Sequence, residues 1–110
     1  MKKSDRPYLQ HILNAIEQIE VYAQEVTYND YIQSPLLQDG YIRQLAIIGE
    51  ASNQLSNELK ETSLDIPWTD IVAMRNKLVH EYFGVDLSTV WATVQNDLPN
   101  LKTFVLKKLH

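Results

Sequence analysis

Residues 67–84 read PWTDIVAMRNKLVHEYFG, and this stretch shows most clearly how the chain folds. Pro67 suits the first turn of a helix, and Gly84 suits a left-handed C-terminal cap. The apolar residues between them recur at helical spacing, so the pattern predicts a helix from Pro67 to Phe83. One stripe of this helix contains Ile71, Leu78 and Tyr82, with Val72 and Val79 beside it.

A charged residue, Arg75, interrupts that stripe at its centre, where a leucine would be typical. Burying a guanidinium costs several kcal/mol unless an anion pairs with it. The ordinary partner is a carboxylate, and Glu50 or Asp70 could supply one. The other candidate partner is the phosphate of a substrate.

Helical patterns also precede residue 67. The first begins after Ser4 and Asp5, either of which suits an N-terminal cap, and runs to about Val26. Thr27 and Asp30 then predict a capped short turn. The predicted core face of the first helix contains Ile12, Ile16, Ile19, Ala23 and Val26.

A second long helix begins at Ser34–Pro35, a capping hydroxyl followed by proline at the first helical position, and is predicted to reach about Lys60. Gly49 lies deep inside it and indicates the close approach of another helix. After a loop over residues 61–66 and the helix bearing Arg75, Asp86 is expected to cap a final helix that Pro99 bends. Its buried face is predicted to hold Trp91, Val94, Leu98, Leu101, Val105 and Leu109.

These patterns predict one all-α domain over residues 1–110, an up-and-down antiparallel bundle of four long helices and a short one. The chain has no cysteine, which favours a reducing cytoplasm, and its apolar runs are too short to span a membrane. The net charge of −4 argues against a protein that coats nucleic acid through bulk positive charge. It still allows a nuclease whose few cations converge on one cleft.

The polar residues of the third long helix point in different directions. At about 100° per residue, Arg75 and Tyr82 share a face, whereas Arg75 and His80 differ by about 140°. One straight helix therefore cannot direct Arg75 and His80 at a single small ligand. Two copies of the helix facing each other across a two-fold axis could form a shared site.

The residue types suit the cleavage of RNA without a metal. Histidine titrates in the range needed to move protons from the 2′-hydroxyl and to the leaving oxygen, so His80 is a candidate acid or base. Arg75 offers a permanent cation for the charge that develops on the phosphate. Asn76 could hold the imidazole or donate a hydrogen bond to phosphate.

The run from Pro67 to Asp86 resembles the signature of the HepT-like branch of the HEPN ribonucleases, whose hallmark is Arg-x4-His-x-Tyr, here Arg75, His80 and Tyr82. Residues 48–51, Ile-Gly-Glu-Ala, are similar to a second block of that family. These ribonucleases are the toxin halves of toxin–antitoxin pairs. The resemblance covers essentially the whole chain.

The resemblance implies a HEPN-like homodimer that cleaves RNA in a cleft between the subunits, without a metal or other cofactor. Arg75 and His80 are then the catalytic pair, and Asn76 is a supporting polar residue. Tyr82 matches the tyrosine that a nucleotidyltransferase antitoxin of the MNT type modifies with adenylate. Because Arg75 and Tyr82 share a face, that phosphate would lie against Arg75 and exclude RNA. For Glu50 only a structural role, such as an ion pair at the dimer interface, is expected.

Two alternatives remain open from the sequence. The chain could be a non-catalytic helical module that binds a nucleotide or a nucleotidyltransferase, which its acidic balance favours. It could also be a structural bundle in which Arg75 pairs with a carboxylate and His80 caps a helix. In that case Tyr82 and Phe83 are core aromatics.

Overall fold

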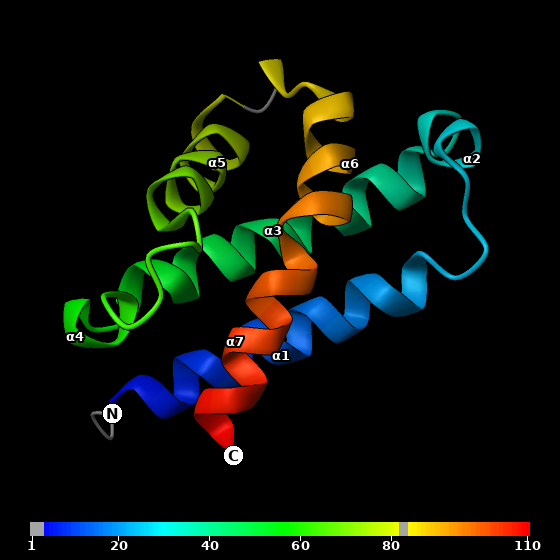
Figure 1. The fold of residues 1–110 in the computed structure, drawn as a ribbon. Helices are drawn as coiled ribbons and strands as arrows, with labels where there is room; N and C mark the ends of the chain where they lie inside the picture. The colour runs from blue at the N-terminus through cyan, green and yellow to red at the C-terminus, as the bar shows by residue number, and fades with distance from the viewer. Residues whose placement is uncertain (1–3, 82–83) are drawn as a thin grey trace.

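The computed structural model describes residues 4–81 and 84–110, which form seven helices and no strand (Figure 1). The all-α prediction is therefore confirmed for these residues. The helices are α1 (Asp5–Tyr22), α2 (Tyr28–Ile32), α3 (Pro35–Gln54), α4 (Asn57–Lys60), α5 (Trp68–His80), α6 (Leu87–Asn96) and α7 (Leu98–Leu109). None of them is both long enough and apolar enough to cross a bilayer.

Helix α3 lies at the centre of the bundle, with α1 packed on one side and α5 on the other (Figure 1). Helix α7 crosses α1, and the end of α7 lies beside the start of α1. Most of the core positions predicted for the first and last helices are buried, and one face of α3 is buried with them. They include Ile12, Ile16, Ile19, Tyr41, Leu45, Ile48, Leu98, Leu101, Val105 and Leu109.

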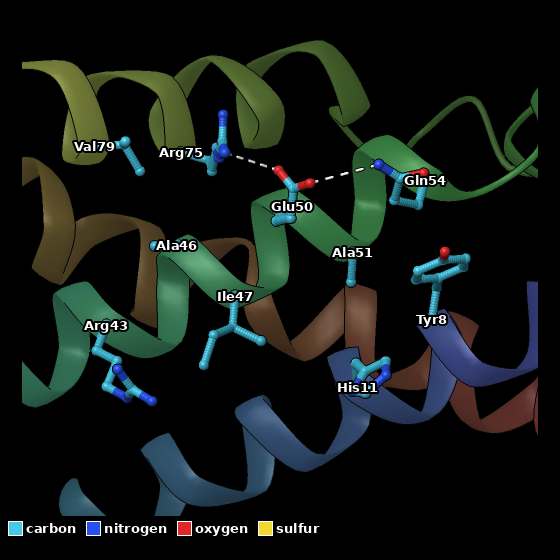
Figure 2. Close-up of a pocket in the computed structure, with 10 residues that line it drawn as sticks. All are labelled: Tyr8, His11, Arg43, Ala46, Ile47, Glu50, Ala51, Gln54, Arg75 and Val79. Atoms are coloured by element: carbon cyan, nitrogen blue, oxygen red, sulfur yellow. Dashed lines mark hydrogen bonds and ion pairs between the residues drawn. The ribbon is translucent and has the colours of Figure 1, made fainter.

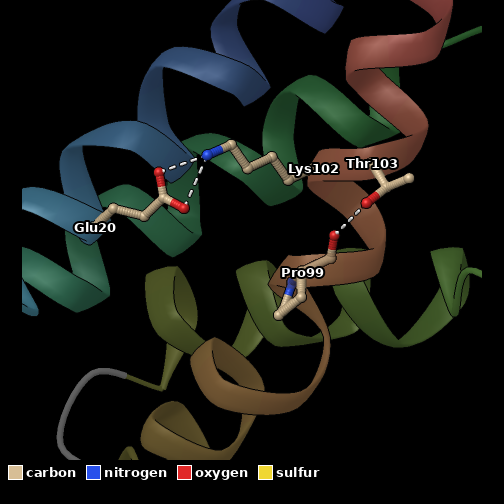
Figure 3. A network of polar contacts seen from close by, with 4 residues as sticks. All are labelled: Glu20, Pro99, Lys102 and Thr103. Atoms are coloured by element: carbon tan, nitrogen blue, oxygen red, sulfur yellow. Dashed lines mark hydrogen bonds and ion pairs between the residues drawn. The ribbon is translucent and has the colours of Figure 1, made fainter.

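Polar contacts also connect α1 with α7. Figure 3 shows the ammonium of Lys102 donating to both carboxylate oxygens of Glu20, at 2.8 and 3.0 Å. At the other end of α1, the Arg6 guanidinium donates to the carbonyl of Leu109 at 3.5 Å. The C-terminal helix is thus fixed across α1.

Two of the predicted capping signals in the first half of the chain are confirmed. Thr27 and Asp30 form a reciprocal capping box at α2. The Ser34 hydroxyl accepts a hydrogen bond from the backbone N–H of Leu37 at the start of α3. Helix α1 ends at Tyr22, four residues before the predicted Val26.

Asp5 has a different role from the predicted cap of its own helix. Its side chain is buried and accepts hydrogen bonds from the backbone N–H and the hydroxyl of Ser56, both at 2.7 Å. Ser56 in turn caps α4 by accepting from the N–H of Leu59. The prediction of a single helix from Ser34 to Lys60 is therefore wrong. The backbone is extended at residues 55–56, and α4 begins as a separate helix after them.

The last predicted helix is likewise two helices. Asp86 caps α6, as predicted, by accepting from the N–H groups of Ser88 and Thr89. The helix breaks at Asp97, and Pro99 then occupies the first turn of α7, where its missing N–H costs no hydrogen bond. The predicted bend is therefore a break between two helices.

The end of α5 differs from the sequence prediction. The helix stops at His80, and the N–H of Glu81 makes its last hydrogen bond to the Lys77 carbonyl. Gly84 lies beyond the helix and its φ is not positive, so the predicted left-handed cap is wrong. Tyr82 and Phe83, which the prediction placed in this helix, lie outside the described residues.

Candidate functional site

The site begins where α3 and α5 cross at Gly49 and Arg75. A Cβ atom built on Gly49 would lie 2.2 Å from the Cβ of Arg75 and 3.1 Å from the carbonyl oxygen of Ile71. Only glycine permits this approach, so the close contact predicted from Gly49 is confirmed. The stem of Arg75 lies on the α3 backbone, and the side chain can extend from there towards solvent.

The Arg75 guanidinium is held by two neighbours. Its Nη2 atom lies 2.9 Å from Oε2 of Glu50 on α3, which is one of the two carboxylates that the sequence offered. Its Nη1 atom donates to Oδ1 of Asn76 at 3.0 Å. Glu50 also accepts a weak hydrogen bond from Gln54 at 3.5 Å, as Figure 2 shows. The hydrogen bond from Arg75 to Asn76 therefore helps to orient the guanidinium, together with the ion pair to Glu50.

This ion pair is accessible to water. The side chain of Arg75 is 28% exposed and that of Glu50 is 48% exposed. Pairs with this much exposure are screened and typically contribute about 0–1 kcal/mol. An incoming phosphate, which carries negative charge and offers bidentate geometry, can therefore compete with Glu50 for the guanidinium.

The ion pair forms part of a groove that runs along α3 between α1 and α5 (Figure 2). The groove has a volume of about 700 Å³. Arg75 and Val79 come from α5, and Tyr8 and His11 come from α1. Helix α3 provides the floor with Arg43, Ala46, Ile47, Glu50, Ala51 and Gln54.

His80 is separate from this groove within one chain. It is the exposed last residue of α5, and the residues lining the groove do not include it. In the described part of the chain, no hydrogen bond joins His80 to Asn76, which instead contacts Arg75. The structure thus agrees with the helical geometry, in which Arg75 and His80 point in different directions.

The charged and aromatic residues of the groove that were not singled out from the sequence are Arg43, Tyr8 and His11. Arg43 precedes Glu50 by seven residues on the same helix, a spacing that places both on one face and could have revealed it. Tyr8 and His11 come from α1, and only the tertiary packing brings them beside α3. In residues 4–81 and 84–110, no group of three His, Cys, Asp or Glu side chains is arranged to hold a metal ion.

Comparison with known proteins agrees with the signature on α5. The family described as "Ribonuclease HepT-like" matches residues 12–107. The chain belongs to the HepT-like ribonuclease family. The match includes the floor of the groove in α3, its wall in α5 and most of the bundle, whereas Tyr8 and His11 on the α1 wall precede the matched residues.

Named relatives share much of the sequence. "Probable ribonuclease HepT" of Thermococcus cleftensis is 44% identical over 93% of each chain. "Putative RNase TTE0752" of Caldanaerobacter subterraneus is 39% identical over 91% of this chain and 89% of its own. A protein of Methanocaldococcus jannaschii named "Gamma-glutamylcyclotransferase and putative RNase MJ0434" is 45% identical over 97% of this chain but only 48% of its own length. No solved structure matches.

Proposed function

We propose that this HepT-like family member is a metal-independent endoribonuclease in which Arg75 binds the scissile phosphate and His80 transfers a proton. The observation that carries the proposal is the position of Arg75, whose guanidinium lies at the wall of an open groove and, among the residues that the structure describes, forms its ion pair with an exposed carboxylate. A buried, fully satisfied arginine could not reach a substrate. The names of the relatives point to the same class of reaction.

The proposed reaction uses the 2′-hydroxyl of RNA as the nucleophile. Its oxygen attacks the adjacent phosphorus, the P–O5′ bond breaks, and the 5′-oxygen leaves with a proton. Histidine can take the first proton or supply the second at neutral pH. The Arg75 guanidinium stabilises the negative charge that grows on the non-bridging oxygens, and Asn76 holds it in place through the 3.0 Å hydrogen bond.

A homodimer would bring the separated groups together. Because Arg75 and His80 diverge within one chain, we propose that two copies face each other and line a shared cleft, with groups from both subunits at each phosphate. Sedimentation at micromolar concentration tests this proposal. A monomer that cleaves RNA at the same concentration would contradict it.

The catalytic assignment is tested by cleavage of RNA in excess EDTA. Wild-type protein should cut under these conditions, and Arg75→Ala and His80→Ala should each abolish cutting. Lys77→Ala is the matched control, since Lys77 is an exposed residue of the same helix and does not line the groove. If Arg75→Ala and His80→Ala cut as fast as Lys77→Ala, the assignment is wrong.

We further propose that the protein acts as the toxin of a cytoplasmic toxin–antitoxin pair. A nucleotidyltransferase antitoxin of the MNT type would attach adenylate to Tyr82 and so inactivate the nuclease. Tyr82→Phe removes the acceptor oxygen but keeps the ring. This variant should arrest growth like wild type and resist neutralisation by the antitoxin, whereas full neutralisation of the variant would contradict the role of Tyr82.

A second candidate function is supported by one specific observation. Arg75 already has a carboxylate partner within its own chain, so a structural ion pair is its alternative role, and the acidic chain would then serve as a helical module that binds a nucleotidyltransferase without cutting RNA. In that case, the purified protein would bind the partner tightly and leave RNA intact. RNA cleavage that depends on His80 would exclude this alternative, since His80 lies outside the ion pair.

A further inference from the structure

The groove contains a second cation that the proposed reaction does not use. Arg43 is exposed, and within residues 4–81 and 84–110 it makes neither an ion pair nor a side-chain hydrogen bond. It lines the same groove as Arg75 but lies two helical turns from Glu50. The rise along α3 between residues 43 and 50 is about 10 Å, so Arg43 occupies a different part of the groove from the Glu50–Arg75 pair.

An aromatic pair lies on the opposite wall. Tyr8 and His11 come from α1, with ring centroids 6.3 Å apart and planes tilted by 45°. Tyr8 is half-buried and His11 is exposed, so both rings can be reached from the groove. Figure 2 shows Arg43 and His11 on the α1 side of α3, with Ile47 between them, and Arg75 on the α5 side.

The charge in the groove favours an anionic chain as its occupant. Among the described residues that line it, two guanidiniums face a single carboxylate, Glu50, which Arg75 already engages. This local excess of positive charge stands out in a protein whose net charge is −4. A partner protein surface would need a carboxylate opposite Arg43, whereas RNA supplies a phosphate at every nucleotide.

We infer that Arg43, His11 and Tyr8 form a second RNA subsite, in which Arg43 binds a phosphate beyond the scissile one and the rings of Tyr8 and His11 offer a stacking surface to an unpaired base. The inference rests on the proposed function, because Arg75 defines the scissile position. It names the substrate class as single-stranded RNA longer than a dinucleotide. Stacking on aromatic rings and phosphate contacts to arginine are the usual means by which proteins hold such strands.

The test measures binding of fluorescent RNA by anisotropy, using full-length His80→Ala protein so that the RNA is not cut. Arg43→Gln in this background should weaken binding of a longer single strand about tenfold and leave a dinucleotide unaffected. The salt dependence of binding should fall by about 0.7 in its logarithmic slope, as for one lost phosphate contact on a single strand. Lys107→Gln is the matched control, since it removes one exposed charge from α7, away from the groove.

Tyr8→Leu is the second variant, since it keeps apolar bulk but removes the ring. It should weaken binding of the longer strand and leave binding of the dinucleotide unchanged.

The subsite is overturned if Arg43→Gln binds RNA as Lys107→Gln does or if it weakens binding of both RNAs equally. It is also overturned if Arg43→Gln converts a dimer to monomers, since the groove would then be a protein interface. Cleavage by wild-type protein is scored separately. RNA that binds through Arg43 but is never cut would overturn the proposed function and support the subsite.

Discussion

Gly49 lies directly beneath Arg75, so closely that a methyl group at position 49 would overlap the Cβ of the arginine. The neighbouring residue, Glu50, then reaches the guanidinium of the same arginine at 2.9 Å. Two consecutive residues of α3 therefore fix both ends of the Arg75 side chain. The crossing of α3 and α5 determines the position of the cation in the groove.

Gly49→Ala should damage both stability and activity. The new methyl group would lie 2.2 Å from Arg75 Cβ, and because the nearest atoms include the Ile71 carbonyl, the helices must move apart. We expect a loss of at least about 2 kcal/mol in the free energy of unfolding, measured with urea. Because Arg75 would be displaced, the rate of RNA cleavage should fall by about a hundredfold when it is measured at urea concentrations below the unfolding midpoint, where the variant is folded.

Gly84→Ala is the matched control for that substitution. A Cβ at position 84 would meet no atom of residues 4–81 and 84–110 within 4 Å, and Gly84 is not among the described residues with a positive φ. The urea midpoint of unfolding of this variant should therefore equal that of the wild-type protein. Equal destabilisation by the two substitutions would refute the close crossing at Gly49.

Glu50→Gln tests whether the carboxylate competes with RNA for Arg75. Glutamine keeps an oxygen that can accept from the guanidinium but removes the negative charge. We expect KM for RNA to fall by up to about tenfold, with stability changed by less than about 1 kcal/mol because the pair is exposed. A fall in kcat at unchanged KM would instead assign Glu50 a role in positioning Arg75.

Asp5→Ala should destabilise the fold without touching the groove. The buried carboxylate accepts two hydrogen bonds from Ser56, so its loss leaves the backbone N–H and the hydroxyl of Ser56 without these acceptors. We expect a cost of about 2–3 kcal/mol by urea unfolding. RNA cleavage by the folded fraction should stay at the wild-type level, and a selective loss of cleavage in folded protein would contradict this purely structural role.

Signals confined to one segment of sequence predicted the fold well. The Ser34 hydroxyl, the Thr27–Asp30 box and the Asp86 carboxylate all act as caps where the sequence placed them. Each involves residues two or three apart, so no knowledge of the tertiary structure is needed. The break at residues 55–56 could not be predicted in this way, because its acceptor, Asp5, is 51 residues distant.

In the candidate site, too, local features could be predicted from the sequence, whereas contacts between distant segments could not. Helical geometry identified Arg75 and its possible partner Glu50, and it showed that His80 points elsewhere. It could not reveal that Tyr8 and His11 line the same groove as Arg43, since that arrangement depends on how α1 packs against α3. Nor could it show that Asn76 contacts Arg75, because adjacent residues of a helix point in different directions unless a long side chain curls back.

Asp97 makes stability depend on pH with a sign opposite to that of most carboxylates. Burial at the junction of α6 and α7 raises the pKa of Asp97 above its ordinary value of 3.8, and the negative charge of Asp70 raises it further. The native state therefore holds this proton more tightly than the unfolded chain, and stability falls as the pH rises through the native pKa. Asp97→Asn should raise the melting temperature at pH 7. The gain in the free energy of unfolding should be less than about 1 kcal/mol, because the group is partly exposed. The gain should shrink as the pH falls and vanish below 3.8, where both states are protonated.

Asp86→Asn provides the contrast, because hydrogen bonds from Ser88, and then Thr89, lower the pKa of Asp86 and make its charge stabilising above 3.8. Circular dichroism melts of both variants over a pH series should show opposite trends, and a pH-independent gain for Asp97→Asn would refute titration as the cause.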